Sequence, residues 1–268
     1  MKPAGLALSI ALALSACSSN PNKDSDPGPA AGQTVSGTPA RGTPEDLYLK
    51  AKKALNKNQY ESAVEKFENL EATFPFGDFA AQARLDIAYA YFKLSELDNA
   101  TAAIDRFLKL YPNSDQGDYA YYLKGLVNFS RGKSLFEKIF PRKMHQLDQT
   151  ALRASFGDFS TLVRKYPDSI YAEDAKHRMI FLRNEMARHE LVTAQYYYKR
   201  SAMVAVINRI NIMLDQYADS PHTADGLAVL ARAHLALGNT QLAEETIKVL
   251  ELNHPQHGSL REFKKVRG

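Results

Sequence analysis

The chain has one cysteine and no tryptophan among its 268 residues. A single thiol cannot form an internal disulfide or a thiolate-metal centre, so we expect packing alone to hold the fold together. Basic residues exceed acidic ones by only four, and both signs are mixed along the chain, which does not favour a nucleic-acid partner. Beyond the first residues, no apolar run approaches the ~20 residues of a transmembrane helix.

Catalytic motifs are missing as well. The patterns G-x-S-x-G and H-E-x-x-H do not occur, nor does the glycine pattern of dinucleotide-binding proteins. Gly132-Lys133-Ser134 resembles the end of a phosphate-binding loop, but Val127 stands where that motif requires glycine. The histidines are scattered, with only His254 and His257 close together. We therefore predict a protein that is not an enzyme and that uses no cofactor or metal.

The single cysteine closes an apolar leader. Lys2 precedes a largely apolar run from Leu6 to Leu14, which is too short to span a bilayer. Leu14-Ser15-Ala16-Cys17 resembles the lipobox of bacterial lipoproteins, in which the thiol is acylated and the chain is cut just before it. We predict a lipoprotein signal peptide at residues 1–16 and lipidation of Cys17 by chains such as palmitate. A plain secretory signal with a chance cysteine is the alternative.

Residues 17–43 are predicted to form the lipidated cysteine and a flexible tether. Pro, Gly, Ser, Thr and Asn dominate this segment, which has almost nothing to bury. Random-coil scaling gives it a reach of roughly 25–30 Å. The residue after the cysteine is Ser18 rather than aspartate, which in a Gram-negative lipoprotein implies sorting to the outer membrane. The acyl chains would then anchor a domain that faces the periplasm.

From Thr43 onward the sequence is periodic. Proline follows an aromatic residue or histidine at Phe74-Pro75, Tyr111-Pro112, Tyr166-Pro167 and His254-Pro255, and Tyr217-Ala218 is a degenerate fifth member. Successive members are 37, 55, 51 and 37 residues apart. This spacing indicates one period of about 37 residues, with the third and fourth repeats enlarged.

Three positions ahead of each pair form an apolar helical face. Twelve residues before the proline or Ala218 stand Ala63, Ala100, Ser155, Val206 and Ala243; eight before stand Phe67, Ile104, Phe159, Ile210 and Ile247; five before stand Leu70, Phe107, Leu162, Met213 and Leu250. Spacings of four and three place such residues on one face of a helix. The proline then ends that helix.

Another amphipathic helix precedes each of these, for example at residues 80–94 and 224–237, and short polar turns join the two. The pattern looks like the tetratricopeptide repeat, a helix-turn-helix unit. We predict an all-α solenoid of about five repeats over residues 44–253, with a concave face made by the first helices. A basic, flexible tail is predicted at 254–268. A generic helical bundle is the alternative fold.

The enlarged repeats carry two further predictions. In the third, residues 131–149 mix Phe136 and Phe140 with basic residues such as Arg142, which indicates either partner docking or packing on its own repeat. In the fourth, residues 171–200 exceed one standard repeat helix. We expect a break near residues 187–190.

Aromatic residues gather in the first two repeats. Phe74, Phe76 and Gly77 follow one second helix, and Tyr89 and Tyr91 lie on the next first helix. Rigid aromatic surface suits the binding of an extended peptide, so we predict these five as substrate-binding residues. For Tyr89, packing in the core between repeats is the favoured alternative.

Four local blocks carry a family resemblance: Phe74-Pro75-Phe76-Gly77, residues 102–107 (AAIDRF), residues 156–167 (FGDFSTLVRKYP) and residues 204–209 (VAVINR). With the lipobox and the five repeats, they closely resemble the BamD (ComL) family of outer-membrane protein assembly lipoproteins. The resemblance covers roughly residues 45–253. It implies a non-enzymatic, cofactor-free adaptor of the machine that folds and inserts β-barrel proteins into the outer membrane.

The resemblance also implies partners. The N-terminal repeats would receive unfolded outer-membrane proteins, although Phe74 stands where the family commonly has tyrosine. The C-terminal repeats would dock on the last periplasmic domain of the barrel insertase BamA, with Arg209 in an interface salt bridge; pairing with a local acid such as Asp215 is the alternative. The segment 132–149 would meet other assembly lipoproteins. An envelope scaffold that binds peptidoglycan or cell-wall synthesis partners remains the alternative function.

Overall fold

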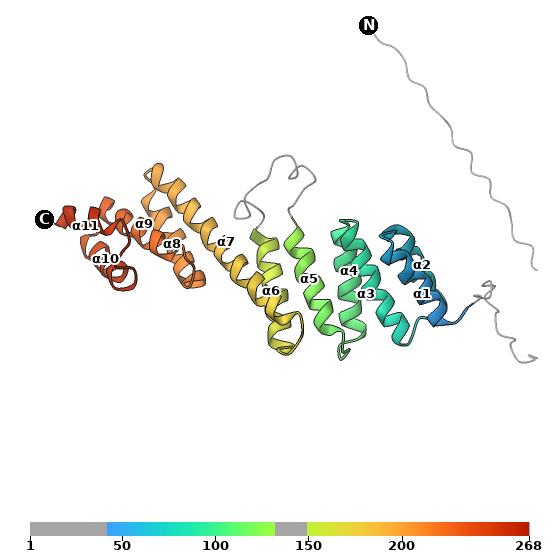
Figure 1. The fold of residues 1–268 in the computed structure, drawn as a ribbon. Helices are drawn as coiled ribbons and strands as arrows, with labels where there is room; N and C mark the ends of the chain where they lie inside the picture. Colours follow the sequence, from blue (N-terminus) through green and yellow to red (C-terminus); the bar gives the residue numbers. More distant parts are fainter. Residues whose placement is uncertain (1–41, 132–148, 268) are drawn as a thin grey trace, which may run out of the picture. The chain divides into compact units, whose positions relative to one another are not determined.

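The computed structural model describes residues 42–131 and 149–267 (Figure 1). Every regular element in this part of the chain is an α-helix. In order they are α1 (Pro44–Asn56), α2 (Tyr60–Thr73), α3 (Asp78–Lys93), α4 (Leu97–Leu110), α5 (Gly117–Ser130), α6 (Gln149–Lys165), α7 (Ala172–Lys199), α8 (Met203–Tyr217), α9 (Thr223–Ala236), α10 (Thr240–Asn253) and α11 (Leu260–Arg267).

The helices pack mainly on their neighbours in sequence. Each helix from α1 to α9 contacts the next, and the first helices α1 and α3 also contact each other, as do α7 and α9. The five pairs α1–α2, α3–α4, α5–α6, α7–α8 and α9–α10 are the five predicted repeats. The all-α, tetratricopeptide-type fold is therefore confirmed.

The predicted apolar face is buried in every repeat. All fifteen positions, from Ala63, Phe67 and Leu70 in the first repeat to Ala243, Ile247 and Leu250 in the fifth, are at most 2% exposed. They lie on the second helices α2, α4, α6, α8 and α10, where they form the core with the first helices. At ~25 cal/mol per Å² of buried apolar area, the burial of these side chains contributes to the stability of every repeat.

Local chemistry sets where the helices begin and end. Thr43 and Asp46 form a capping box at the start of α1, with Pro44 in its first turn. The second helices end just before the predicted aromatic-proline pairs, and the residue before proline donates its N–H back to the helix, as Phe74 does to the Leu70 carbonyl at 2.7 Å. Proline lacks an N–H and cannot continue this pattern.

Helix α7 corrects one prediction. It runs unbroken from Ala172 to Lys199, through the expected break at residues 187–190. The helix has no proline or glycine, and its buried residues Leu182, Met186 and Leu191 follow one continuous face. Nothing in the segment interrupts the hydrogen-bond ladder, so the extra length extends the helix instead of forming a second one.

The C-terminal segment corrects a second prediction. Residues 254–268 were expected to be a flexible tail, but α11 lies within them and buries Leu260 and Phe263 against α9 and α10. This helix covers the apolar end of the last repeat, which the basic composition of the segment had obscured.

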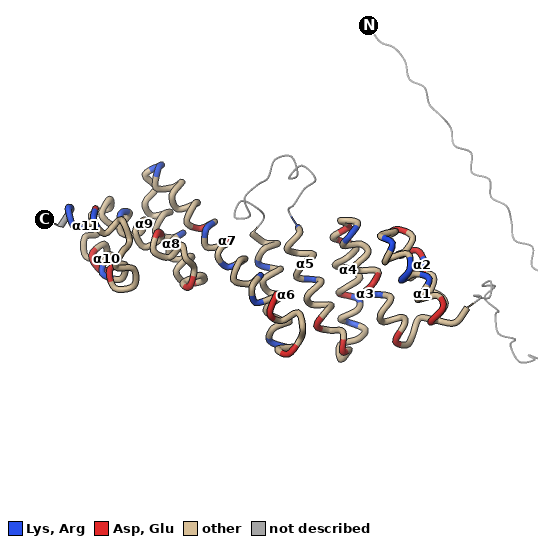
Figure 2. Tube along the Cα trace, in the orientation of Figure 1, with Lys and Arg blue, Asp and Glu red and all other residues tan. Residues whose placement is uncertain are grey.

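Several predicted features lie outside the described residues, namely the signal peptide, Cys17, most of the tether, and Phe136, Phe140 and Arg142. Among the helices that are described, none combines the length and the apolarity needed to cross a membrane. Basic and acidic residues both occur on most of these helices (Figure 2).

Candidate functional site

A nearly buried carboxylate joins the first helices of repeats 1 and 2. Asp86 on α3 is 5% exposed, and it accepts a hydrogen bond from the Tyr48 hydroxyl at 2.8 Å and one from the Lys52 ammonium at 2.7 Å. Burial, reinforced by the Asp86 charge, raises the pKa of Tyr48. The phenol therefore stays protonated and acts as a donor.

A similar network joins the first helices of repeats 3 and 4. The rings of Tyr122 and Tyr171 stack with centroids 4.7 Å apart, and the Tyr122 hydroxyl donates to Asp174 at 2.7 Å. Arg178 pairs with the same carboxylate. Partial burial opposes ionisation of Asp174, but the hydrogen bonds from Arg178 and Tyr122 outweigh it and lower its pKa.

Tyr119 on α5 connects the two networks. Its ring lies 5.5 Å from that of Tyr171, and burial, together with the nearby charge of Asp86, raises its pKa. We call the residues of these networks, all half-buried except the buried Asp86, the first-helix surface: Tyr48, Lys52, Asp86, Tyr119, Tyr122, Tyr171, Asp174 and Arg178. They present rigid aromatic faces beside fixed charges, an arrangement that suits binding rather than covalent chemistry.

The five predicted substrate-binding residues do not form one site. Phe76 is 88% exposed, while Phe74 is half-buried at the C-cap of α2. Tyr89 packs between the cores of the first two repeats, as the alternative held. Gly77 and Tyr91 line two different pockets.

Sequence reasoning overlooked Tyr48 and Tyr171 on the first-helix surface. The spacing of Tyr48 and Lys52, one helical turn apart on the first helix, was the available signal. Their partner Asp86 lies 34 residues or more away along the chain, so the pairing itself had no local signature.

Position 77 requires glycine because of its backbone conformation, and not because a side chain would collide with its neighbours. It stands before α3 with φ 99° and ψ 176°, which residues with a Cβ rarely adopt, yet no atom would contact a Cβ there. It lines a wide pocket of about 630 Å³ together with the loop Tyr111–Gln116. This loop connects α4 to α5.

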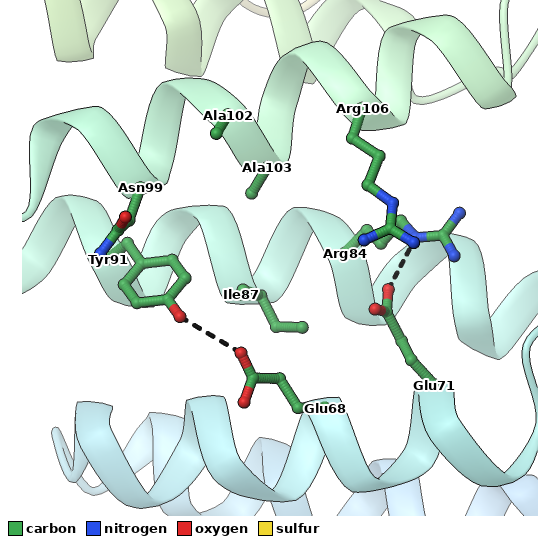
Figure 3. A pocket seen from close by; sticks show the side chains of 9 residues that line it. All are labelled: Glu68, Glu71, Arg84, Ile87, Tyr91, Asn99, Ala102, Ala103 and Arg106. Atoms are coloured by element: carbon green, nitrogen blue, oxygen red, sulfur yellow. Dashed lines mark hydrogen bonds and ion pairs between the residues drawn. The ribbon is translucent and has the colours of Figure 1, made fainter. Parts of the chain in front are cut away.

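Tyr91 belongs to a smaller pocket of about 240 Å³ between α2, α3 and α4 (Figure 3). Its hydroxyl donates to Glu68 at 3.2 Å. At the other end, Arg84 pairs with Glu71 at 2.8 Å, and Arg106 extends toward the same pair. Burial raises the pKa of Glu71 despite the opposing charges of Arg84 and Arg106.

Arg209, the predicted partner-binding residue, is engaged within the chain. Its guanidinium lies 3.2 Å from the carboxylate of Glu190 on α7, and Arg153 on α6 approaches that carboxylate at 4.0 Å. The acid proposed as a local alternative, Asp215, is not the partner. The Arg209 side chain still keeps 39% of its surface exposed.

Metal chemistry has no candidate in the described ranges, since no three His, Cys, Asp or Glu side chains there are grouped so that they could hold an ion. His257 instead approaches Asp225, at 3.2 Å.

Comparisons with known proteins show which family the chain is similar to. The family profile YfiO, described as outer membrane lipoprotein, matches residues 40–250. The chain is similar to the outer membrane protein assembly factor BamD of Neisseria meningitidis serogroup A, with 38% identity over 96% of this chain and 92% of the relative. It is also similar to the protein of that name from Vibrio cholerae, with 35% identity over 78% of this chain and 87% of the relative.

Among solved structures, a crystal structure of MamA aligns with 80% of this chain and 96% of its own, at 13% identity and a TM-score of 0.37. With 38% identity across nearly its whole length to a relative named BamD, and a profile match that spans all five repeats, the chain belongs to the YfiO family of outer membrane lipoproteins.

Proposed function

We propose that the protein is a non-enzymatic assembly factor for outer-membrane β-barrel proteins. The observation that carries this proposal is the similarity to relatives named outer membrane protein assembly factor BamD, which extends over 96% of the chain. The repeat array supports it, because stacked helix pairs offer long binding surfaces without any catalytic group. The named relatives are assembly factors, which favours this role over an envelope scaffold.

Anchoring is part of the proposal. The thiol of Cys17 would carry acyl chains that hold the protein in the outer membrane, and residues 18–43 would tether the repeats on the periplasmic face. Lipidation would serve localisation only. A Cys17→Ala variant should therefore fold like the parent protein, which circular dichroism of the purified variant would check.

The first-helix surface is the proposed receiver of unfolded barrel proteins. Its half-buried Tyr48 and Tyr122 are held by hydrogen bonds to Asp86 and Asp174, so these two side chains would lose little conformational entropy on binding. Phe76, which is 88% exposed on the loop between α2 and α3, would add an aromatic contact for the same ligand. An extended, partly aromatic segment is the ligand that such a surface suits.

The insertase BamA is the proposed partner of repeat 4. An acid of its periplasmic domain would approach the partly exposed Arg209 side chain, whose guanidinium can donate to two carboxylates at once. Residues 132–149, with Phe136, Phe140 and Arg142, are proposed to contact other assembly lipoproteins.

Photocrosslinking in cells tests the proposal. A photoreactive residue at Phe76 should capture nascent outer-membrane proteins and one at Arg209 should capture the insertase, whereas one at Glu244, exposed on α10, should capture neither. If Phe76 and Arg209 gave the same products as Glu244, the assembly role would be wrong.

A charge test addresses the insertase contact. Arg209→Gln should reduce co-purification of the insertase at low salt, while Arg164→Gln, at an exposed arginine on α6, should not. Glutamine is preferred to glutamate at position 209 because a second acid beside the buried Glu190 would destabilise the fold further than the loss of the arginine alone. Equal recovery with both variants would exclude this salt bridge.

A further inference from the structure

The pocket between α2, α3 and α4 has a chemistry that neither the first-helix surface nor the Arg209 contact uses. Residues of three successive helices line it: Glu68, Glu71, Arg84, Ile87, Tyr91, Asn99, Ala102, Ala103 and Arg106. Its volume of about 240 Å³ lies below the range of ~300–1,000 Å³ typical of small-molecule sites. The pocket therefore fits a single side chain or a fragment of that size.

One cation in the pocket has no dedicated partner. The Arg84 guanidinium is nearly buried; it pairs with Glu71 at 2.8 Å and donates to the Tyr111 hydroxyl at 3.2 Å. Arg106 is exposed, and within the described residues it makes no hydrogen bond or ion pair, although its charge acts on Glu71. The two arginines and Glu71 leave one positive charge at this end of the pocket.

The other end repels anions. Among the described residues, the neutral Tyr91 hydroxyl is the only hydrogen-bond donor to Glu68, at 3.2 Å, and Asn99 adds an uncharged amide. Between the two ends the lining is apolar, with Ile87 on α3 and Ala102 and Ala103 on α4, as Figure 3 shows. A ligand is thus oriented, because its anionic group is attracted to Arg106 and kept away from Glu68.

We propose that this pocket binds a carboxylate at the end of a short apolar stem, namely a glutamate side chain of a partner protein. The methylenes of the stem would lie on Ile87, Ala102 and Ala103, and the carboxylate would accept two hydrogen bonds from the planar guanidinium of Arg106. The small alanine side chains on α4 leave the room that the stem requires. This inference goes beyond the assembly role and does not depend on it.

Nuclear magnetic resonance of the uniformly ¹⁵N-labelled protein tests the proposal, with N-acetylglutamate amide as probe and N-acetylglutamine amide as its neutral isostere. The glutamate probe should shift the backbone amides of Tyr91, Ala102 and Ala103 in a saturable way, and the glutamine probe should not. Pentanoate, a free carboxylate on an apolar stem, should shift the same amides more weakly, because it lacks the peptide groups. Tighter binding of pentanoate would show that a free small carboxylate is the ligand and would overturn the choice of a protein side chain.

Two substitutions act in opposite directions. Arg106→Gln should weaken binding of the glutamate probe at least tenfold, whereas Glu68→Gln should strengthen it severalfold, since the repulsive charge is gone. Both residues are exposed, so neither change removes a core contact, and unchanged spectra elsewhere would verify the fold. Equal shifts with both probes, undiminished binding to Arg106→Gln, or shifts confined to other helices would each overturn the proposal.

Discussion

The Arg209 guanidinium on α8 lies 3.2 Å from the carboxylate of Glu190 on α7, whose side chain is only 3% exposed. Arg153 on α6 approaches the same carboxylate from the preceding helix, at 4.0 Å. A buried carboxylate is stable only where cations or donors compensate the loss of its hydration. Arg209 is therefore a structural counter-ion as well as the proposed contact of the insertase.

This pairing predicts a non-additive effect on stability. Arg209→Gln should lower the free energy of unfolding by about 2 kcal/mol, because it leaves Glu190 buried with only the distant Arg153. Adding Glu190→Gln should restore part of that loss. Urea denaturation of the two single variants and the double variant would measure the coupling, and purely additive losses would contradict it.

The core was predictable because burial is encoded locally. Residues such as Phe67, Phe107 and Phe159 recur at fixed distances before a proline. In a helix, this spacing places them on the same face as the other apolar residues of their repeat, and that face is buried. The contacts that hold functional side chains are not local. Asp86 meets Tyr48 38 residues away, and Glu190 meets Arg209 19 residues away, so only the packed helices bring them together.

Both errors in the secondary structure have a physical reason. An average repeat length suggested a break in α7, but the segment has no helix breaker and its apolar face continues past Glu190. The basic composition of residues 254–268 suggested a free tail, but two apolar residues, Leu260 and Phe263, are enough to dock α11 on the last repeat. Composition and mean length were weaker guides than the spacing of individual apolar residues.

Helices α5 and α6 approach closely at Gly125, so a larger residue there should destabilise the protein. The Ser155 hydroxyl donates to the Gly125 carbonyl at 2.9 Å, and a Cβ on Gly125 would overlap the buried ring of Phe159. Gly125→Ala should therefore destabilise the protein by roughly 2–3 kcal/mol. Thermal denaturation followed by circular dichroism would measure the loss.

Gly226 on α9 provides the matched control. A Cβ there would overlap the terminal methyl of Met213, the far end of a flexible side chain, while the Met213 sulfur and an Ile210 methyl would lie at ordinary contact distances. Alanine also favours a helix interior over glycine. Gly226→Ala should therefore change stability by less than about 1 kcal/mol. A loss equal to that of Gly125→Ala would show that the ring of Phe159 is not the obstacle.

The turns between paired helices predict two changes of opposite sign. Ser201 and Gly238 occupy the same place in repeats 4 and 5, with φ of 58° and 74°. The left-handed region costs a residue with a Cβ roughly 1 kcal/mol relative to glycine. Ser201→Gly should raise the unfolding free energy by up to that amount, and Gly238→Ala should lower it, as urea midpoints would show. Shifts of the same sign would contradict this account.

His234 on α9 predicts a loss of stability in mild acid. The residue is 8% exposed, its Nδ1 has no hydrogen-bond partner in the described part of the chain, and burial lowers its pKa below the ordinary 6.5. The folded state thus binds the proton less readily than the unfolded chain does. The contribution of His234 to the free energy of unfolding is therefore constant above pH 6.5 and declines as the pH falls below that value.

The measurement is the difference between urea midpoints at pH 7.5 and pH 5.5. Replacing the titrating ring in His234→Gln should make this difference smaller than in the parent protein, whatever the variant's stability at pH 7.5. His177→Gln is the control, because His177 is 71% exposed and pairs only with exposed Glu173, a contact worth little. If His234→Gln kept the full acid sensitivity of the parent, other groups, such as Asp174, whose pKa is lowered, would account for it.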